Sequence, residues 1–224
     1  MKRLIIIGEG QTEQAFCNDV LQDYFNARGI YIQNPTIKKS KGGIVSWVEL
    51  KKQIENHLKQ DTSVVVSLLI DYYGISSKHQ FPNWIEALTI VDKNQRMIAI
   101  EQAMLEDIEG NIRHRFIPYI QLHEFEGLLF SDKQVFDNSF DSDEFNDYQY
   151  LQETLDTFDN PEEINDSRET APSKRLERII KGYKSEKENL KVFYGTLLAQ
   201  AIGLNTIMKK CPRFHHWITK LESI

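Results

Sequence analysis

The sequence predicts an α/β fold in which a mainly parallel central sheet is flanked by helices. Two short apolar runs, KRLIII and SVVVSLLI, are typical of strands that are buried on both faces. Elsewhere, apolar residues recur at the three- and four-residue spacing of amphipathic helices. Strands that alternate with helices in this way favour a parallel sheet with right-handed crossovers. The 224 residues, 41% of them hydrophobic, are enough to bury a sizeable core.

The N-terminal residues predict a strand, a helix and a second strand. The first strand is expected over 2–7, where the apolar run ends at a glycine. Helical spacing of apolar residues follows over 12–28, and Gly29 supplies a stop signal. The segment IYIQ at 30–33 predicts a second strand, which Pro35 ends because proline cannot donate a ladder hydrogen bond.

The middle of the chain continues the alternation. Ser46, followed three residues later by a glutamate, is a capping-box pattern that predicts a helix to about Leu58. The β-branched run at 63–70 is the strongest strand signal in the sequence. A helix is expected over 96–108, and the segment RFIPYIQLH at 115–123 predicts a further strand.

The character of the sequence changes near residue 132. We expect residues 1–132 to form the α/β core, and residues 133–224 to form an acidic, loop-rich segment and a helical extension packed on it as one compact domain. Helical spacing recurs at 173–183, 188–202 and 213–222.

The net charge of −6 is unevenly distributed. Residues 137–169 contain 12 Asp and Glu and a single basic residue, which leaves 26 Lys and Arg against 21 Asp and Glu elsewhere, a net charge of +5. The rest of the chain could therefore attract a phosphate backbone. The acidic segment itself is open to three interpretations: a lid, an autoinhibitory mimic of nucleic acid, or a solubilising insertion.

Cysteine usage and hydropathy indicate the compartment. The two cysteines are far apart and lack CxxC spacing, so neither a disulfide framework nor a thiolate zinc site is expected. No apolar run approaches the ~20 residues of a membrane helix, and the N-terminal run is too short for a signal sequence. We therefore expect a cytoplasmic protein with no membrane partner.

Acidic residues follow three of the predicted strands. Glu9 follows the first, Asp71 follows the 63–70 run, and Glu124 and Glu126 follow the 115–123 segment. Ligands of open α/β sheets gather at the carboxyl ends of the strands, and hard divalent cations prefer carboxylate oxygens. Carboxylates that share one edge repel one another unless a cation or a proton lies among them. The alternative is that each acid caps the helix after it, where a negative charge stabilises by about 0.3–1 kcal/mol.

The segment GEGQTE after the first strand does not fit a nucleotide-binding loop. The dinucleotide fingerprint needs a third small residue where Glu13 stands, and a carboxylate there would repel a pyrophosphate. No GK[ST] sequence follows, which excludes a P-loop.

Four stretches resemble a known family. IGEGQTE after the first strand, with an acid after a later hydrophobic strand, is similar to the Toprim fold of topoisomerases, primases and overcoming-lysogenization-defect nucleases. Three longer blocks resemble the signatures of a Toprim-related bacterial family of unknown function that is often encoded beside an ABC-type ATPase. These blocks are FIPYIQLHEFEGLLFSD at 116–132, INDSRETAPSKRL at 164–176 and CPRFHHWITKL at 211–221.

The resemblance implies a Toprim-like fold and a metal site. In Toprim nucleases, Mg²⁺ is bound by the glutamate after the first strand and by a D-x-D pair after a later strand. The resemblance therefore implies that Glu9 is this glutamate and that Asp71 is the first aspartate of the pair. The implied cofactor is Mg²⁺ or Mn²⁺. Tyr73 replaces the second aspartate of the pair. Glu124 or Glu126 is then expected to supply the missing oxygen. Glu13, one helical turn beyond Glu9, is a further candidate ligand.

Five other residues are candidates for catalysis or phosphate binding. His123 is either a general base or metal ligand, or a histidine that bonds to the backbone at a helix start. Ser173, Lys174 and Arg175 lie in the first turn of a predicted helix, which suits a phosphate, although they are also compatible with a solvated helix face. Lys41, in the loop KKSKGG, could grip a nucleic-acid strand or be solvated.

These patterns lead to an expected function with two alternatives. We expect an Mg²⁺-dependent nuclease, in bacterial phage defence or DNA repair, with nucleic acid and an ABC-type ATPase as partners. The first alternative is a degenerate Toprim module that binds the ATPase or nucleic acid without catalysis, because Tyr73 replaces a metal-binding acid. The second is a small-molecule phosphohydrolase that uses the same carboxylates. The sequence leaves the oligomeric state open.

Overall fold

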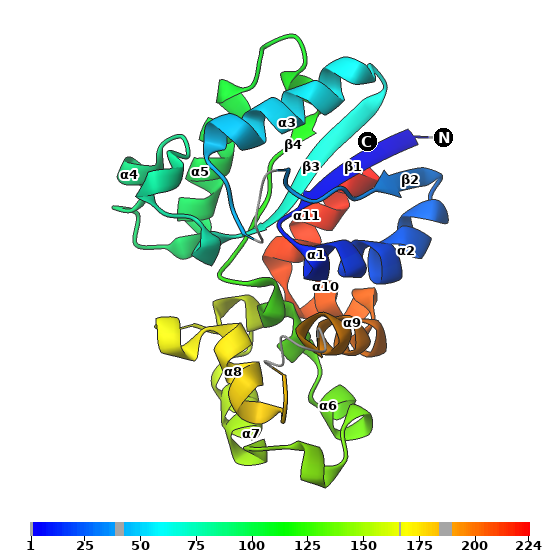
Figure 1. The fold of residues 1–224 in the computed structure, drawn as a ribbon, viewed down its shortest axis with the longest axis vertical. Helices are drawn as coiled ribbons and strands as arrows, with labels where there is room; N and C mark the ends of the chain where they lie inside the picture. The colour runs from blue at the N-terminus through cyan, green and yellow to red at the C-terminus, as the bar shows by residue number, and fades with distance from the viewer. Residues whose placement is uncertain (1, 39–42, 166, 184–189) are drawn as a thin grey trace.

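A five-stranded parallel sheet forms the centre of the molecule, as the computed structural model shows for residues 2–38, 43–165, 167–183 and 190–224 (Figure 1). The strand order is β2-β1-β3-β4, and β5 also pairs with β3. The strands are β1 (Lys2–Gly8), β2 (Ile30–Gln33), β3 (Val64–Asp71), β4 (Phe116–Ile117) and β5 (Ile120–Gln121). The predicted α/β fold with a mainly parallel sheet is confirmed.

The predicted strand at 115–123 is interrupted. Phe116 pairs with Val66 and Ile120 pairs with Ile70, so β4 and β5 keep one register along β3. The interruption falls at Pro118, which has no N–H for the ladder. β5 then delivers the segment that contains Glu124 to the carboxyl edge of the sheet.

Helices cover both faces of the sheet. On one face lie α1 (Gln11–Phe16), a π-helical turn (Cys17–Leu21) and α2 (Gln22–Asn26), which together confirm the predicted helix over 12–28. α2 is followed by a turn that reaches Gly29, whose φ of +73° is a left-handed conformation that glycine adopts readily. The other face packs against α3 (Trp47–Gln60) and α5 (Lys93–Asp107), with the short α4 (Trp84–Ala87) beside α5.

Alternation along the strands divides the core into two layers. In β1, Leu4 and Ile6 belong to the cluster that contains the α1–α2 side chains, whereas Ile5 and Ile7 belong to the cluster that contains the α3 and α5 side chains. Because successive strand side chains point to opposite faces, a continuous apolar strand serves both layers.

Six helices follow the sheet in the part of the chain that the structure describes. They are α6 (Lys133–Ser139), α7 (Tyr148–Thr157), α8 (Pro172–Ile179), α9 (Leu190–Ile202), α10 (Leu204–Lys210) and α11 (Pro212–Glu222). Short 3-10 turns occupy Tyr72–Gly74, Ser77–His79, Arg113–Arg115, Ser142–Glu144, Pro161–Glu163 and Arg168–Thr170, and a longer 3-10 segment spans Phe125–Ser131.

Three of these helices, α6, α7 and α10, lie outside the sequence prediction, and the last two show the reason. α7 falls in the acidic stretch expected to be loop-rich, where Asp147 accepts a hydrogen bond from the Tyr150 N–H and Leu151 and Thr154 are buried. α10 falls between two predicted helices, and it begins after Gly203 with φ of +76°. In both cases the residue at the N-terminus and a few buried side chains stabilise a short helix that has no long periodic pattern in the sequence.

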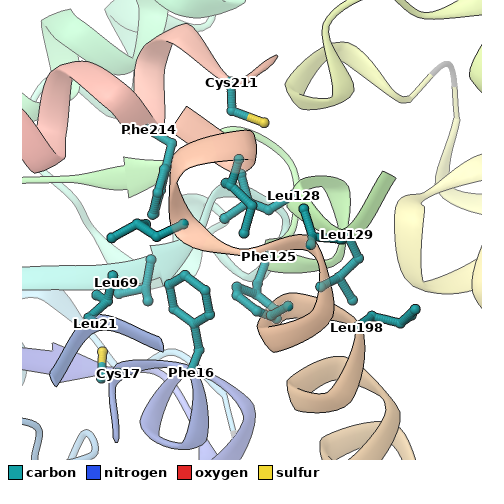
Figure 2. Close-up of a cluster of buried hydrophobic side chains, with 14 of the residues drawn as sticks. Phe16, Cys17, Leu21, Leu69, Phe125, Leu128, Leu129, Leu198, Cys211 and Phe214 are labelled. Atoms are coloured by element: carbon teal, nitrogen blue, oxygen red, sulfur yellow. The ribbon is translucent and has the colours of Figure 1, made fainter. Parts of the chain in front are cut away.

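The C-terminal helix α11 is part of the layer that covers the sheet. Trp217 is buried, its indole Nε1 donates to Ser67 Oγ in β3 at 2.9 Å, and its ring stacks on Tyr119 with centroids 4.5 Å apart. The other C-terminal helices lie at the carboxyl edge of the sheet (Figure 1), where α1 packs against α9. Figure 2 shows Phe16 of α1, Phe125 of the 3-10 segment and Leu198 of α9 in this apolar cluster.

Replacing Trp217 with phenylalanine should lower the free energy of unfolding by about 1–2 kcal/mol, because the variant loses the Ser67 hydrogen bond and part of the buried volume. Urea denaturation measures the change. His215→Ala, at an exposed position of the same helix, should stay within about 0.5 kcal/mol of the parent. Equal effects in the two variants would contradict this packing of α11.

Within the described ranges, the helices are too short or too polar to cross a membrane.

Candidate functional site

The carboxyl edge of the sheet contains a pocket of about 340 Å³ in which the predicted acids meet. Glu9, Asp71 and Glu124 line it, together with Tyr73, Gly74, Ala171, Lys174 and Lys191. Glu9 Oε2 accepts a hydrogen bond from the Asp71 N–H at 3.2 Å, which joins the ends of β1 and β3. The structure therefore brings together acids that are 62 and 53 residues apart in the chain.

Glu9 is positioned by backbone and by a glycine. Its N–H donates to the Leu69 carbonyl at 3.1 Å, so the strand pairing continues through the residue. Its carboxylate lies over Gly74, where a Cβ atom would stand 3.1 Å from Oε1 and 3.3 Å from Oε2. A glycine at position 74 therefore leaves the space that the carboxylate occupies.

Asp71 and Glu124 each accept a hydrogen bond from a backbone N–H group near the pocket. Asp71 Oδ1 accepts from the Phe125 N–H at 2.9 Å, and Glu124 Oε2 accepts from the Ser173 N–H at 2.8 Å. Ser173 is in the first turn of α8, so Glu124 lies at the N-terminus of a distant helix and not of the helix after it, which was the capping alternative. Both carboxylates keep further oxygen lone pairs for the pocket.

Glu13 and Glu126 lie behind this pocket. Glu13, on α1, is 7% exposed, and its Oε2 accepts from the Gly10 N–H at 2.7 Å. Glu126 is 1% exposed, and its Oε1 is 2.6 Å from Lys191 Nζ, which comes from α9. The five predicted acidic residues thus form one cluster, in which Lys191 is ion-paired with Glu126.

The electrostatics of the cluster follow from burial and like charge. Burial, with the neighbouring carboxylates of Glu126 and Glu124, raises the pKa of Glu9. Burial, then the charges of Glu13 and Glu9, raises the pKa of Asp71 well above its usual range. Burial and Glu126 also raise the pKa of Glu124, and they raise that of Glu13 to about 7. A bound cation would relieve this repulsion.

Lys191 supplies part of the compensating charge. Burial acts to lower its pKa, but the carboxylates of Glu126, Asp71 and Glu124 outweigh that effect and raise the value. Lys191 therefore stays an ammonium that faces the pocket. The sequence analysis missed this residue because no motif surrounds it, and only tertiary packing of α9 on α1 brings it to the acids.

The donor set fits a hard divalent cation in chemistry and charge. The predicted ligands offer carboxylate oxygens alone, which Mg²⁺ and Mn²⁺ prefer. Among the described residues, no three His, Cys, Asp or Glu side chains stand in a formed metal-holding arrangement. Cation binding would therefore require the Glu9 and Glu124 carboxylates, now hydrogen-bonded to the Asp71 and Ser173 N–H groups, to move closer together.

His123 lies beside the pocket and next to Tyr73. Its backbone carbonyl accepts from the Tyr73 N–H at 3.1 Å, and the two ring centroids are 5.5 Å apart. Burial, with the charges of Lys93 and Arg96, lowers the pKa of His123 to about 3, so the ring is neutral at physiological pH. The ring lines a neighbouring pocket, which Asn165 also lines.

The three predicted phosphate-binding residues of α8 have different environments. The Ser173 N–H is engaged by Glu124. Arg175 is buried, and its guanidinium donates to the Thr170 carbonyl and to Thr154 Oγ1, each at 2.9 Å. Lys174 lines the carboxylate pocket, and its Nζ is 2.8 Å from Glu177 Oε1.

The remaining candidate, Lys41, lies outside the described residues.

The sequence of the chain matches one family model over almost its whole length. The Domain of unknown function (DUF4276) matches residues 8–222, and the chain belongs to this family. The predicted membership of a family of unknown function is confirmed. Neither the curated proteins nor the solved structures contain a match to this chain.

Proposed function

We propose that this protein is an Mg²⁺- or Mn²⁺-dependent nuclease that cleaves phosphodiester bonds of nucleic acid. The observation that supports it most is the convergence of Glu9, Asp71 and Glu124 on one pocket that also contains Lys174 and Lys191. Carboxylates suit a divalent cation, and ammonium groups beside them suit the oxygens of a phosphate.

The resemblance to Toprim proteins supports the same function. The glutamate that follows the first strand and the aspartate that follows a later strand correspond to Glu9 and Asp71, and their strands β1 and β3 are direct neighbours in a parallel sheet. A site of this kind is expected at the carboxyl ends of the strands.

In this mechanism the chain supplies ligands, charge and orientation. The chemistry that a divalent cation would supply here is polarisation of the phosphate and a lower pKa of an attacking water. Glu9, Asp71 and Glu124 would hold the cation, with Asp71 oriented by the Phe125 N–H. Lys191, fixed 2.6 Å from Glu126, presents an ammonium to the phosphate oxygens and to the charge that develops on them. Lys174 lines the same pocket and adds a second positive charge.

The proposed context also rests on the resemblance. Relatives of the Toprim-related bacterial family are often encoded beside an ABC-type ATPase, and we propose such an ATPase as the partner in phage defence or DNA repair. The ATPase would give the cleavage an energy-dependent control.

One observation favours a second candidate, a module that binds nucleic acid or the ATPase without cleavage. Tyr73 stands where Toprim nucleases have a second aspartate, and its hydroxyl is hydrogen-bonded to Asn165 Nδ2 rather than offering a carboxylate. The two candidates differ in whether a divalent cation and Glu9 are required for a chemical change in the nucleic acid.

The test is a cleavage assay with the full chain, alone and with the neighbouring ATPase. Plasmid, linear duplex, single-stranded DNA and RNA are incubated with Mg²⁺, Mn²⁺ or EDTA. The nuclease proposal expects cation-dependent cleavage that Glu9→Gln abolishes and that Glu86→Gln, at an exposed position of α4, leaves intact. Binding without cleavage in every condition would favour the module, and hydrolysis of free nucleotides alone would favour a phosphohydrolase.

Gly74→Ala should weaken divalent-cation binding by about tenfold, equivalent to about 1.4 kcal/mol. The new Cβ would stand 3.1 Å from Glu9 Oε1 and displace that carboxylate. Isothermal titration with Mn²⁺ measures the affinity. The matched control is Gly110→Ala, where a Cβ meets no atom of the described chain within 4 Å. A Gly74→Ala affinity equal to that of the control would contradict the role of Glu9.

A further inference from the structure

A second pocket, of about 360 Å³, lies near the carboxylate pocket. Tyr73 lines the carboxylate pocket, and the ring of His123, 5.5 Å away from the Tyr73 ring, lines the second one. We call it the histidine pocket; Lys93, Leu122, His123, Phe158 and Asn165 are the lining residues that matter below. The two pockets therefore have neighbouring aromatic rings in their linings.

Asn165, which lines the histidine pocket, has a buried polar atom without a partner among the described residues. Asn165 is only 3% exposed, and one end of its amide contacts the Tyr73 hydroxyl and lies 3.2 Å from His123 Nδ1. The other end, Oδ1, has no hydrogen-bond partner within the described part of the chain. If the Asn165 amide is turned by half a turn, its nitrogen takes the place of the oxygen, and the atom at that place is still polar and unpaired. A buried polar atom without a partner is costly, and a ligand that reaches it after a small rotation of the amide would recover that cost.

His123 and Lys93 complete the polar wall. His123 has φ of +66°, a left-handed conformation that is unusual for a residue other than glycine and that clusters at ligand sites. Lys93, in the first turn of α5, places its Nζ 3.4 Å from His123 Nε2 and 3.3 Å from the Asn165 carbonyl oxygen. The ammonium and the unpaired amide atom thus belong to one small group of side chains.

We propose that the histidine pocket binds an unpaired nucleobase of the strand whose phosphate lies in the carboxylate pocket. A base edge offers donors and acceptors to Lys93 and Asn165, and its apolar faces suit Leu122 and Phe158. A second phosphate fits less well, because the acidic residues Asp92, Glu162 and Glu163 line the same pocket.

This inference rests on the proposed nuclease function and narrows its substrate. The edge of a base in a duplex is already paired, so a base in this pocket must come from a single strand or from a locally opened duplex. The expected substrate is therefore single-stranded nucleic acid, or a duplex that has been opened at the cleavage site.

The test compares two short single-stranded oligonucleotides that differ only in central abasic sugars. Fluorescence anisotropy measures their binding to the full chain in Ca²⁺, for the parent protein, Lys93→Met, Asn165→Ala and the control Lys52→Met, an exposed lysine on α3. The parent and the control should prefer the base-containing strand by about tenfold. Lys93→Met and Asn165→Ala should lose that preference while binding the abasic strand as the parent does.

Each outcome decides between the two proposals. A parent that cleaves nucleic acid in Mg²⁺ but shows no preference for the base-containing strand would overturn the base pocket alone, as would variants that keep the full preference. A parent that neither binds nor cleaves nucleic acid would overturn both. Because Lys93→Met replaces a side chain at a helix end, its thermal unfolding should match the parent, which separates loss of the base contact from loss of the fold.

Discussion

Asp71→Asn should abolish cation-dependent cleavage, lowering kcat/KM at least about a thousandfold, while stabilising the cation-free protein at pH 8 by about 1–2 kcal/mol. Both effects have one cause. The pKa of Asp71 is raised well above its usual range by burial and by the charges of Glu13 and Glu9, so its ionised form is unfavourable without a cation. Asparagine removes the charge and keeps Oδ1, which can still accept from the Phe125 N–H.

The two effects are measured on the same preparation. Thermal unfolding in EDTA gives the stability of the cation-free variant, and added Mg²⁺ or Mn²⁺ should stabilise the parent more than the variant. Asp132→Asn is the matched control, since asparagine also caps a helix and Asp132 caps α6 outside the cluster. An active Asp71→Asn variant, or one that is destabilised in EDTA, would contradict this explanation of the site.

Stability in EDTA should fall as the pH rises from about 5 to 8, and Glu13 should account for about 3 kcal/mol of that fall. Burial, then the charge of Glu126, raises the pKa of Glu13 from 4.5 to about 7. Between these two values the native protein keeps a proton that the unfolded chain has lost, so stability is complete below pH 4.5 and is lost as the pH passes 7.

Glu13→Gln should therefore flatten the pH profile and raise the stability at pH 8 relative to pH 5. Urea denaturation at the two pH values measures it, and Glu86→Gln, at an exposed position, should keep the parental slope. Divalent cations should restore stability to the parent at pH 8, because their charge compensates the ionised cluster. A parental slope in Glu13→Gln would show that Glu13 ionises in the native protein as it does in the unfolded chain.

The fold was largely predictable because its strongest signals are local. The runs at 2–7 and 63–70 are long, apolar and β-branched, and the structure confirms both as neighbouring strands. From that pairing, the meeting of Glu9 and Asp71 follows directly, since the ends of adjacent parallel strands lie at one edge. Because the sheet is buried on both faces, its strands have continuous apolar runs rather than alternating apolar and polar residues.

The parts of the site that could not be predicted depend on tertiary packing. Lys191 reaches Glu126 because α9 packs against α1, and no local pattern encodes that contact. Glu124 was expected either to cap the helix after it or to join the acids; it joins the acids, and the helix whose N-terminus it contacts, α8, comes from another part of the chain. Asn165 lies in a loop without periodic signal, and its amide meets Tyr73 across a sequence separation of 92 residues.

The most direct test of the central claim is the titration of Mn²⁺ into the parent protein, Glu9→Gln, Asp71→Asn and Glu124→Gln by isothermal calorimetry. If the three carboxylates share one cation, the parent binds it and each substitution weakens that same site by about tenfold or more. Parental affinity in all three variants, or no cation binding by the parent, would contradict the claim.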